Sequence, residues 1–194
     1  MFYCTQPEDP IIAGNLKNMA GNLREANRVS FPARIVPSNG ERLVLFGHGS
    51  PEQMAVGKER LSGWQLSNFL WENGLRGEHE ILLISCRTGK EAGAKGLAFE
   101  LAKDLGARNI TGFVKAPRGW VVGSRDLVGG LPQVLNSDPL ARAVASGSNS
   151  KVQGVLSDFA QSFPMPPADA WRKFGVSKKA SAALGVADIL GLFS

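Results

Sequence analysis

The sequence of 194 residues contains only two cysteines, Cys4 and Cys86. Two cysteines cannot build a disulfide framework, and no Cys-x-x-Cys spacing is present to hold a structural zinc ion. No run of about 18 apolar residues is present to span a membrane, and the first ten residues lack the basic start and apolar stretch of a signal peptide. We therefore expect a protein that is cytoplasmic, or secreted without a cleaved signal peptide, and that has no membrane span.

Several motifs that would assign a function are also missing. The sequence has no Gly-x-Gly-x-x-Gly, no P-loop and no Gly-x-Ser-x-Gly elbow, which counts against a dinucleotide site, a nucleotide triphosphate site and a serine α/β-hydrolase. Lys and Arg number 22 and Asp and Glu 17, which gives a net charge of +5. This basic excess is scattered rather than gathered in a block, so it hints only weakly at an acidic partner. We expect no nucleic-acid partner.

The composition is that of a globular protein, with 43% hydrophobic and 20% charged residues. The length fits one domain, so we expect a single domain over residues 1–194. Its core is expected at about residues 41–122, and a C-terminal helical extension at about residues 151–194. Strand-like and helix-like patterns alternate through the core, which predicts βαβ units, a mainly parallel sheet and the α/β class.

Short continuous apolar runs and periodic segments give the expected elements. The runs typical of buried strands are 43–46, 81–84 and 110–114, and 120–122 is a further extended piece. Residues 1–4 are predicted to be an edge strand that precedes a helix. Helices are predicted at 61–71 and 94–105, the second with Gly106 as its C-cap, and further helices around 152–159 and at the C-terminus.

Two predicted strands end in residues that can react. His48 follows the first buried strand, and Cys86 follows the second after one crossover. Because parallel strands place their carboxyl ends at the same edge of a sheet, we expect His48 and Cys86 to be neighbours if the strands are adjacent. An imidazole can take the proton of a thiol, and the start of a following helix would favour the thiolate. The amides of Gly49 and Cys86 would form an oxyanion hole.

These residues resemble a known family. An apolar strand ending in His-Gly (LVLFGHG), followed one crossover later by a strand ending in Ser-Cys (ILLISCRTG), is similar to the caspase-like (clan CD) cysteine peptidases. Within that clan, ISCRTG followed by an Ala-rich helix and VKAP is most similar to the self-cleaving cysteine protease domain of bacterial RTX toxins and related effectors. The similarity covers about residues 41–122.

The resemblance implies a three-layer caspase-like sandwich and a cysteine endopeptidase. It makes His48 the catalytic histidine, Cys86 the nucleophile and the Gly49 amide part of the oxyanion hole. It places substrate binding at Arg118, Gly119 and Trp120. The implied setting is a bacterial toxin or secreted effector that acts on a protein or peptide substrate in a target-cell cytosol, with a possible immunity protein as partner.

The family's toxin domains also bind inositol hexakisphosphate through a basic patch. The Lys and Arg residues here do not match that patch position by position, so no cofactor is expected.

Other readings stay open beside the peptidase. The chain could be a catalytically inactive caspase-like module that binds a protein partner at the strand-end cleft, or a processing domain cut from a larger polypeptide. A buried cysteine is most often an inert packing residue, and Cys4 is expected in the core or partly exposed. His79 is expected on a surface loop. Cys4, His48, His79 and Cys86 share no metal-ligand spacing, so no metal site is predicted.

Overall fold

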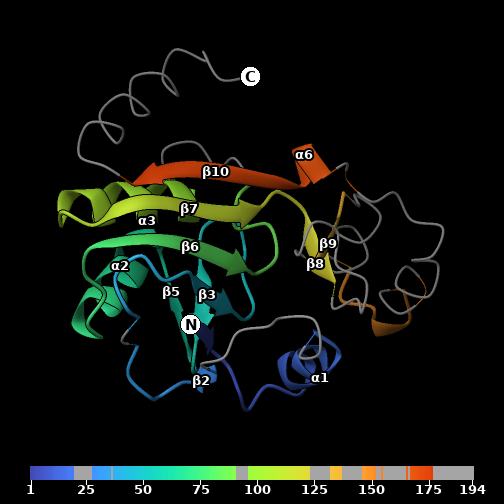
Figure 1. Ribbon diagram of the computed structural model, residues 1–194. Coiled ribbons are helices and arrows are strands. Elements are labelled where there is room, and N and C mark those ends of the chain that lie inside the picture. Colours follow the sequence, from blue (N-terminus) through green and yellow to red (C-terminus); the bar gives the residue numbers. More distant parts are fainter. Residues whose placement is uncertain are drawn as a thin grey trace.

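The structure, a computed structural model, describes residues 1–19, 28–35, 37–90, 96–122, 132–136, 146–151, 154, 165 and 167–176 (Figure 1). Its centre is a six-stranded sheet in the order β10-β7-β6-β3-β1-β2. Five strands run parallel, and the edge strand β10 runs antiparallel to β7. The strands are β1 (Phe2–Cys4), β2 (Arg28–Ser30), β3 (Leu43–Phe46), β6 (Glu78–Ile84), β7 (Thr111–Pro117) and β10 (Trp171–Val176). The expected α/β class with a mainly parallel sheet is confirmed.

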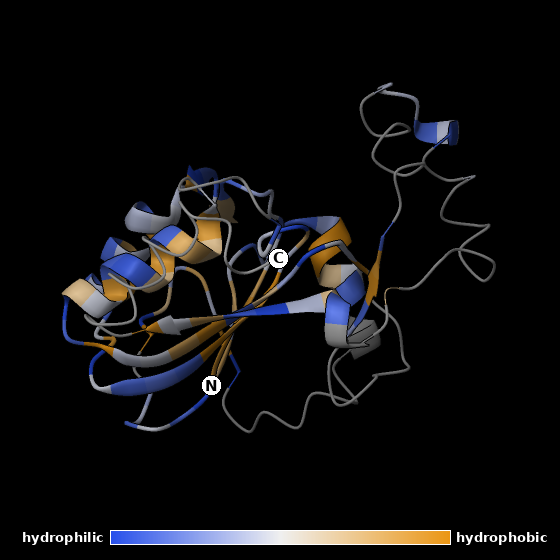
Figure 2. Ribbon diagram, turned by 90° about the horizontal axis from the view of Figure 1, so that it is seen from above, coloured by the Kyte–Doolittle hydropathy of each residue, from blue (hydrophilic) through white to orange (hydrophobic). Residues whose placement is uncertain are grey.

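The central strands are apolar throughout because both faces of the sheet are covered. All four residues of β3 are buried. Leu43 and Leu45 belong to one hydrophobic cluster, whereas Val44 and Phe46 belong to another on the opposite face. This alternation explains why the strands read as continuous apolar runs in the sequence. Figure 2 shows hydrophobic residues concentrated in the central strands and on the inner sides of the helices.

Helices cover both faces of the sheet. Helices α2 (Gly63–Glu72) and α3 (Leu97–Ala107) contribute to the cluster on one face, and α1 (Pro10–Met19) packs with Ile12 against the other. A capping box in which Ser62 and Gln65 exchange hydrogen bonds fixes the start of α2. No described helix is long and apolar enough to cross a membrane.

Two small hairpins accompany the sheet. Strands β4 (Met54–Val56) and β5 (Glu59–Leu61) follow β3 and pair antiparallel around a two-residue turn. Gly57 begins that turn with a φ of 58°, a conformation that suits glycine. Strands β8 (Trp120–Val122) and β9 (Gln133–Leu135) form the second hairpin. In Figure 1 the arrowheads of β6 and β7 point toward the side on which β8, β9 and α1 lie.

Three sequence-based expectations about these elements are wrong. Strand β1 is not at an edge, because it pairs with both β2 and β3. The C-terminal region is not purely helical: after the short helix α6 (Pro167–Ala170), strand β10 adds to the sheet by pairing with β7. Helix α3 continues past Gly106 and is capped by Arg108. The helices expected around 152–159 and at the C-terminus fall largely or wholly outside the described residues.

Candidate functional site

The sheet places His48 and Cys86 at the same level of its carboxyl edge. Strands β3 and β6 are adjacent and parallel, and their last registered pair is Phe46 with Ile84. The Gly47 amide donates to the carbonyl of Ile84 at 3.3 Å, a bond that belongs to this last pair. His48 and Cys86 each lie two residues beyond the registered pair. The expected adjacency of the two strands is therefore present, and neighbouring strands lie about 4.8 Å apart.

His48 is held by the segment that follows β1. Its backbone N–H donates to Oε1 of Gln6 at 3.0 Å, and its Nε2 lies 3.2 Å from Oδ1 of Asp9. The same Asp9 oxygen accepts the amides of Ile11 and Ile12 and so caps α1. These amide bonds, that of Ile12 foremost, and the contact with His48 hold the pKa of Asp9 below its ordinary value. An ionised carboxylate therefore faces His48, and Nδ1 is the ring nitrogen left for another partner.

Cys86 lies in a tight turn that is tied to the β7–β8 connection. Arg87 has a φ of 59°, the left-handed conformation that non-glycine residues adopt at a cost of roughly 1 kcal/mol or more. Its amide donates to the carbonyl of Gly119 at 2.7 Å, which holds the strained residue in place. The Cys86 thiol makes a long contact of 3.8 Å with the carbonyl of Val121. Backbone strain of this kind is often found at functional sites.

The resting thiol of Cys86 is not activated as a thiolate. Burial raises the pKa of this thiol, and the contact with Val121 and the nearby charge of Arg87 offset only part of the rise. The described helix α3 begins at Leu97 rather than directly after Cys86, so its N-terminus does not supply the expected local stabilisation of the thiolate. The expectation of a favoured thiolate is therefore wrong for the resting state. A base must remove the proton during attack.

Gly49 lies between the two strand ends and cannot carry a larger side chain. A Cβ atom there would overlap Oγ of Ser85 and lie 2.7 Å from Cγ2 of Thr88. Gly49 forms an isolated antiparallel bridge with Met54. The hydrogen bonds of this bridge are made by the neighbouring residues: the Ser50 amide donates to the Gln53 carbonyl, and the Ala55 amide donates to the His48 carbonyl. Within the described chain these bonds leave the Gly49 N–H without an acceptor. The amide is thus available beside the loop that carries Cys86, as an oxyanion donor requires.

Trp120, His48 and Gly49 line one cavity of about 540 Å³. The Trp120 ring also lies 5.5 Å from the guanidinium carbon of Arg87, within the range of a cation–π contact. Cys86 does not line this cavity in the resting structure. The cavity therefore brings together the histidine, the oxyanion candidate and one expected substrate-binding residue.

Arg118 and Gly119 lie apart from this cavity. Arg118 is exposed, and its amide donates to the carbonyl of Ala170 at 2.9 Å. Gly119 is buried against the β9 strand, where a Cβ would overlap the carbonyl of Leu135. Of the three expected substrate-binding residues, the structure thus brings only Trp120 beside His48.

The other histidine and cysteine are structural. His79 is buried on β6 with 1% exposure, so its expected place on a surface loop is wrong. Its ring nitrogens lie 2.9 Å from the Glu41 carbonyl and 2.7 Å from the Arg76 carbonyl. Cys4 is buried in the sheet core, and burial raises the pKa of its thiol. Among the described residues no group of three or more His, Cys, Asp or Glu is placed to hold a metal ion.

Sequence reasoning missed the segment that positions His48. Asp9 followed by Pro10 is a signal for a helix N-terminus, with Asp as N-cap and Pro at the first helical position. Read together with a strand at residues 1–4, that signal would have placed Asp9 at the carboxyl end of a parallel strand. An edge strand at residues 1–4 would lie remote from His48, so the sequence alone does not connect Asp9 with His48.

Comparison with known proteins gives a family. No curated protein matches this chain. The family described as a domain of unknown function, DUF8616, matches residues 18–126, which is more than half of the 194 residues. The matched range contains His48, Cys86 and Trp120, whereas Gln6 and Asp9 precede it and β10 follows it. The chain therefore belongs to the DUF8616 family.

Proposed function

We propose that the protein is a cysteine endopeptidase of the caspase-like type, with Cys86 as nucleophile and His48 as base. The observation that carries the proposal is the placement of the two residues, each two positions beyond the Phe46–Ile84 pair on adjacent parallel strands. Further support comes from a sheet covered by helices on both faces, as the caspase-like resemblance implies. The family itself is described without an activity, so the proposal depends on the site.

In the proposed reaction His48 acts as a general base. As Cys86 attacks the peptide carbonyl carbon, its thiol proton passes to Nδ1 of His48, and the Gly49 amide donates to the developing oxyanion. Asp9 stabilises the imidazolium because its carboxylate lies 3.2 Å from Nε2. His48 then gives the proton to the departing amine as the carbon–nitrogen bond breaks. Water resolves the thioester and returns the thiol.

The resting geometry sets a condition on this reaction. The thiol contacts the carbonyl of Val121 and has a raised pKa. Attack therefore requires the Cys86 side chain to leave Val121 and meet His48 when a substrate occupies the cavity beside Trp120. A protonated resting thiol is consistent with a base that acts only once substrate is bound.

A second candidate is an inactive caspase-like module that binds a protein partner at the same strand-end cleft. The resting thiol favours it, because Cys86 contacts the carbonyl of Val121 and does not line the cavity that contains His48. Labelling with a peptide that carries a thiol-reactive group separates the candidates. Because the peptidase brings His48 to Cys86 once a peptide is bound, it predicts that Cys86 reacts faster than the buried Cys4 and that His48→Ala slows the reaction. A rate at Cys86 that is unchanged in a folded His48→Ala would favour the binding module.

The direct test is cleavage of a mixed peptide library by wild type, Cys86→Ala and His48→Ala under reducing conditions, with products identified by mass spectrometry. The peptidase predicts cleavage by wild type and loss in both variants. Cleavage that survives in Cys86→Ala would overturn the proposal. The same experiment on the wild-type chain alone shows whether it trims itself, as a processing domain would.

The biological setting follows from the resemblance alone. We propose a bacterial toxin or secreted effector that cleaves a target-cell protein, with an immunity protein as a possible partner. Toxicity of the wild type on expression in a target cell, absent from Cys86→Ala, is the expected result. Equal toxicity of the two proteins would contradict this setting.

A further inference from the structure

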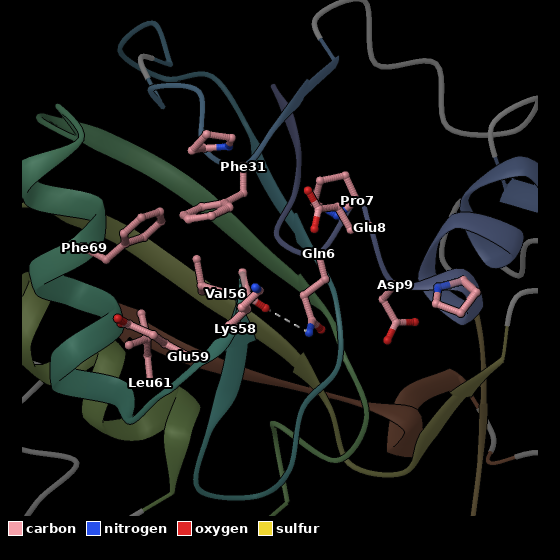
Figure 3. A pocket seen from close by; sticks show the side chains of 13 residues that line it. Gln6, Pro7, Glu8, Asp9, Phe31, Val56, Lys58, Glu59, Leu61 and Phe69 are labelled. Carbon is pink, nitrogen blue, oxygen red and sulfur yellow. Dashed lines mark hydrogen bonds between the residues drawn. The ribbon is translucent and has the colours of Figure 1, made fainter.

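A second, larger cavity adjoins the His48 site at the carboxyl edge of the sheet. It has a volume of about 880 Å³ and is formed by the segment after β1, the segment after β2 and the β4–β5 hairpin (Figure 3). The chain runs from β1 outward to β2 and then returns to β3 on the other side of β1. The strand order therefore reverses between β1 and β3. In open α/β sheets this reversal point is where ligands bind.

The cavity is continuous with the residues that hold His48. Gln6, Asp9 and Lys58 line both this cavity and the smaller one that contains His48 and Trp120. Gln6 accepts the His48 amide through Oε1 and donates through Nε2 to the carbonyl of Gly57 at 3.3 Å. One side chain thus joins the His48 loop to the hairpin. A chain bound beside His48 can place a side chain in the larger cavity.

The lining combines an apolar surface with carboxylates. Phe31, Leu61 and Phe69 are partly buried and pack against the core. In Figure 3 the rings of Phe31 and Phe69 lie on one side of the cavity, and Glu8 and Asp9 lie on the other.

The charges around the cavity are mainly negative. The carboxylates of Glu8, Asp9 and Glu59 outnumber the one lining ammonium group, that of Lys58. This excess stands out in a chain whose net charge is +5. The lowered pKa of Asp9 keeps one of these carboxylates ionised near neutral pH. An acidic rim over an apolar wall is complementary to a long side chain with a cationic end.

We propose that this cavity binds a lysine or arginine side chain of the peptide substrate, close to the scissile bond. The inference rests on the proposed peptidase function. The aliphatic stem packs on Phe31, Leu61 and Phe69, and the cationic end meets Glu8 and Glu59. The aromatic rings add cation–π attraction. An acidic side chain is repelled by the same carboxylates, and a short side chain leaves the apolar wall open to water.

The test measures binding without cleavage, in the full chain carrying Cys86→Ala. Fluorescent peptides with a single lysine are compared, by anisotropy, with the same peptides carrying norleucine, which keeps the stem without the charge. We expect the lysine peptide to bind about three- to tenfold more tightly at low salt, the range of a few partly exposed charge pairs. Salt at about 0.5 M should reduce the difference.

Two variants locate the effect. In Cys86→Ala with Glu8→Gln and Glu59→Gln, the preference for lysine over norleucine should fall below about twofold. Glu78→Gln, an exposed position where β6 begins at the opposite edge of the sheet, is the matched control and should keep the preference. Circular dichroism verifies that each variant is folded. Equal binding of the lysine and norleucine peptides, or a preference that survives the double change, would overturn the inference.

The outcomes separate the cavity from the reaction. A lysine preference in binding, without cleavage of any library peptide by wild type, supports the cavity assignment and contradicts the peptidase. Cleavage by wild type that depends on Cys86 but ignores lysine and arginine supports the peptidase and overturns the cavity assignment.

Discussion

The contact between Asp9 and His48 gives the most informative single substitution. Asp9 has two roles, because the same oxygen caps α1 and lies 3.2 Å from Nε2 of His48. Asp9→Asn removes the charge but keeps a side-chain oxygen, and Asn is as good an N-cap as Asp. Asp9→Ala removes both. The pair of variants therefore separates support of the imidazolium from support of the helix.

The size of the effect follows from the distance and the exposure. Two unit charges at 3.2 Å attract by about 5 kcal/mol at an effective dielectric constant of about 20, and by about 1.3 kcal/mol in bulk water. The side chains of His48 and Asp9 are 43% and 29% exposed, so their attraction is closer to the value for bulk water. Measured surface pairs contribute up to about 1 kcal/mol. We therefore expect kcat/KM to fall about fivefold in Asp9→Asn, mostly in kcat.

The assay is steady-state cleavage of the best library peptide, with thermal unfolding measured on the same samples. Asp9→Asn should lose activity with only a small fall in Tm, from the loss of the charge, whereas Asp9→Ala should lose about 1 kcal/mol of stability in addition because the cap is lost. Cleavage by Asp9→Asn at the wild-type rate would refute the role of Asp9 toward His48. A fall in the Tm of Asp9→Asn as large as that of Asp9→Ala would refute the separation of the two roles.

Three further predictions concern the site and its support. Gly49→Ala should abolish cleavage and lower the free energy of unfolding by about 1–3 kcal/mol, because the added Cβ overlaps Oγ of Ser85. The control is Gly14→Ala, where nothing lies within 4 Å of the added Cβ. An active Gly49→Ala would contradict the predicted overlap with Ser85. Folding lowers the pKa of Asp9 from 3.8, so its contribution to stability is present above that pH and lost as pH falls through the lowered value. The Tm of wild type should therefore drop more steeply with acid than that of Asp9→Asn, and parallel curves would contradict this. His79→Leu should lower the free energy of unfolding in urea by about 1–3 kcal/mol, because the buried ring faces the carbonyls of Glu41 and Arg76 and leucine can donate to neither; an unchanged midpoint would contradict it.

The sequence predicted the parts of the fold that are encoded locally. Strands such as 43–46 and 81–84 are continuous apolar runs because helices bury both faces of the sheet, so their pattern reveals them. The neighbouring positions of His48 and Cys86 could be predicted because one crossover joins adjacent parallel strands.

The remaining features depend on pairing between distant segments. Strand β10 joins β7 across a long stretch of chain, and its sequence, WRKFGV, has no clear strand pattern. His79 is a buried position in β6, between two less buried glutamates. In the sequence alone, those flanking glutamates favour a surface loop. The larger cavity combines residues after β1 and β2 with the β4–β5 hairpin, so it can be recognised only once the strand order is known.

Covalent capture tests the central claim most directly. Mixed-sequence peptides with an acyloxymethyl ketone at the C-terminus would be incubated with wild type and His48→Ala under reducing conditions, and the modified residue mapped by mass spectrometry. The account predicts one adduct, on Cys86, with Cys4 unmodified and the rate reduced about 100-fold or more in His48→Ala. No adduct, an adduct on Cys4, or equal labelling of Cys86 in a folded His48→Ala would contradict it.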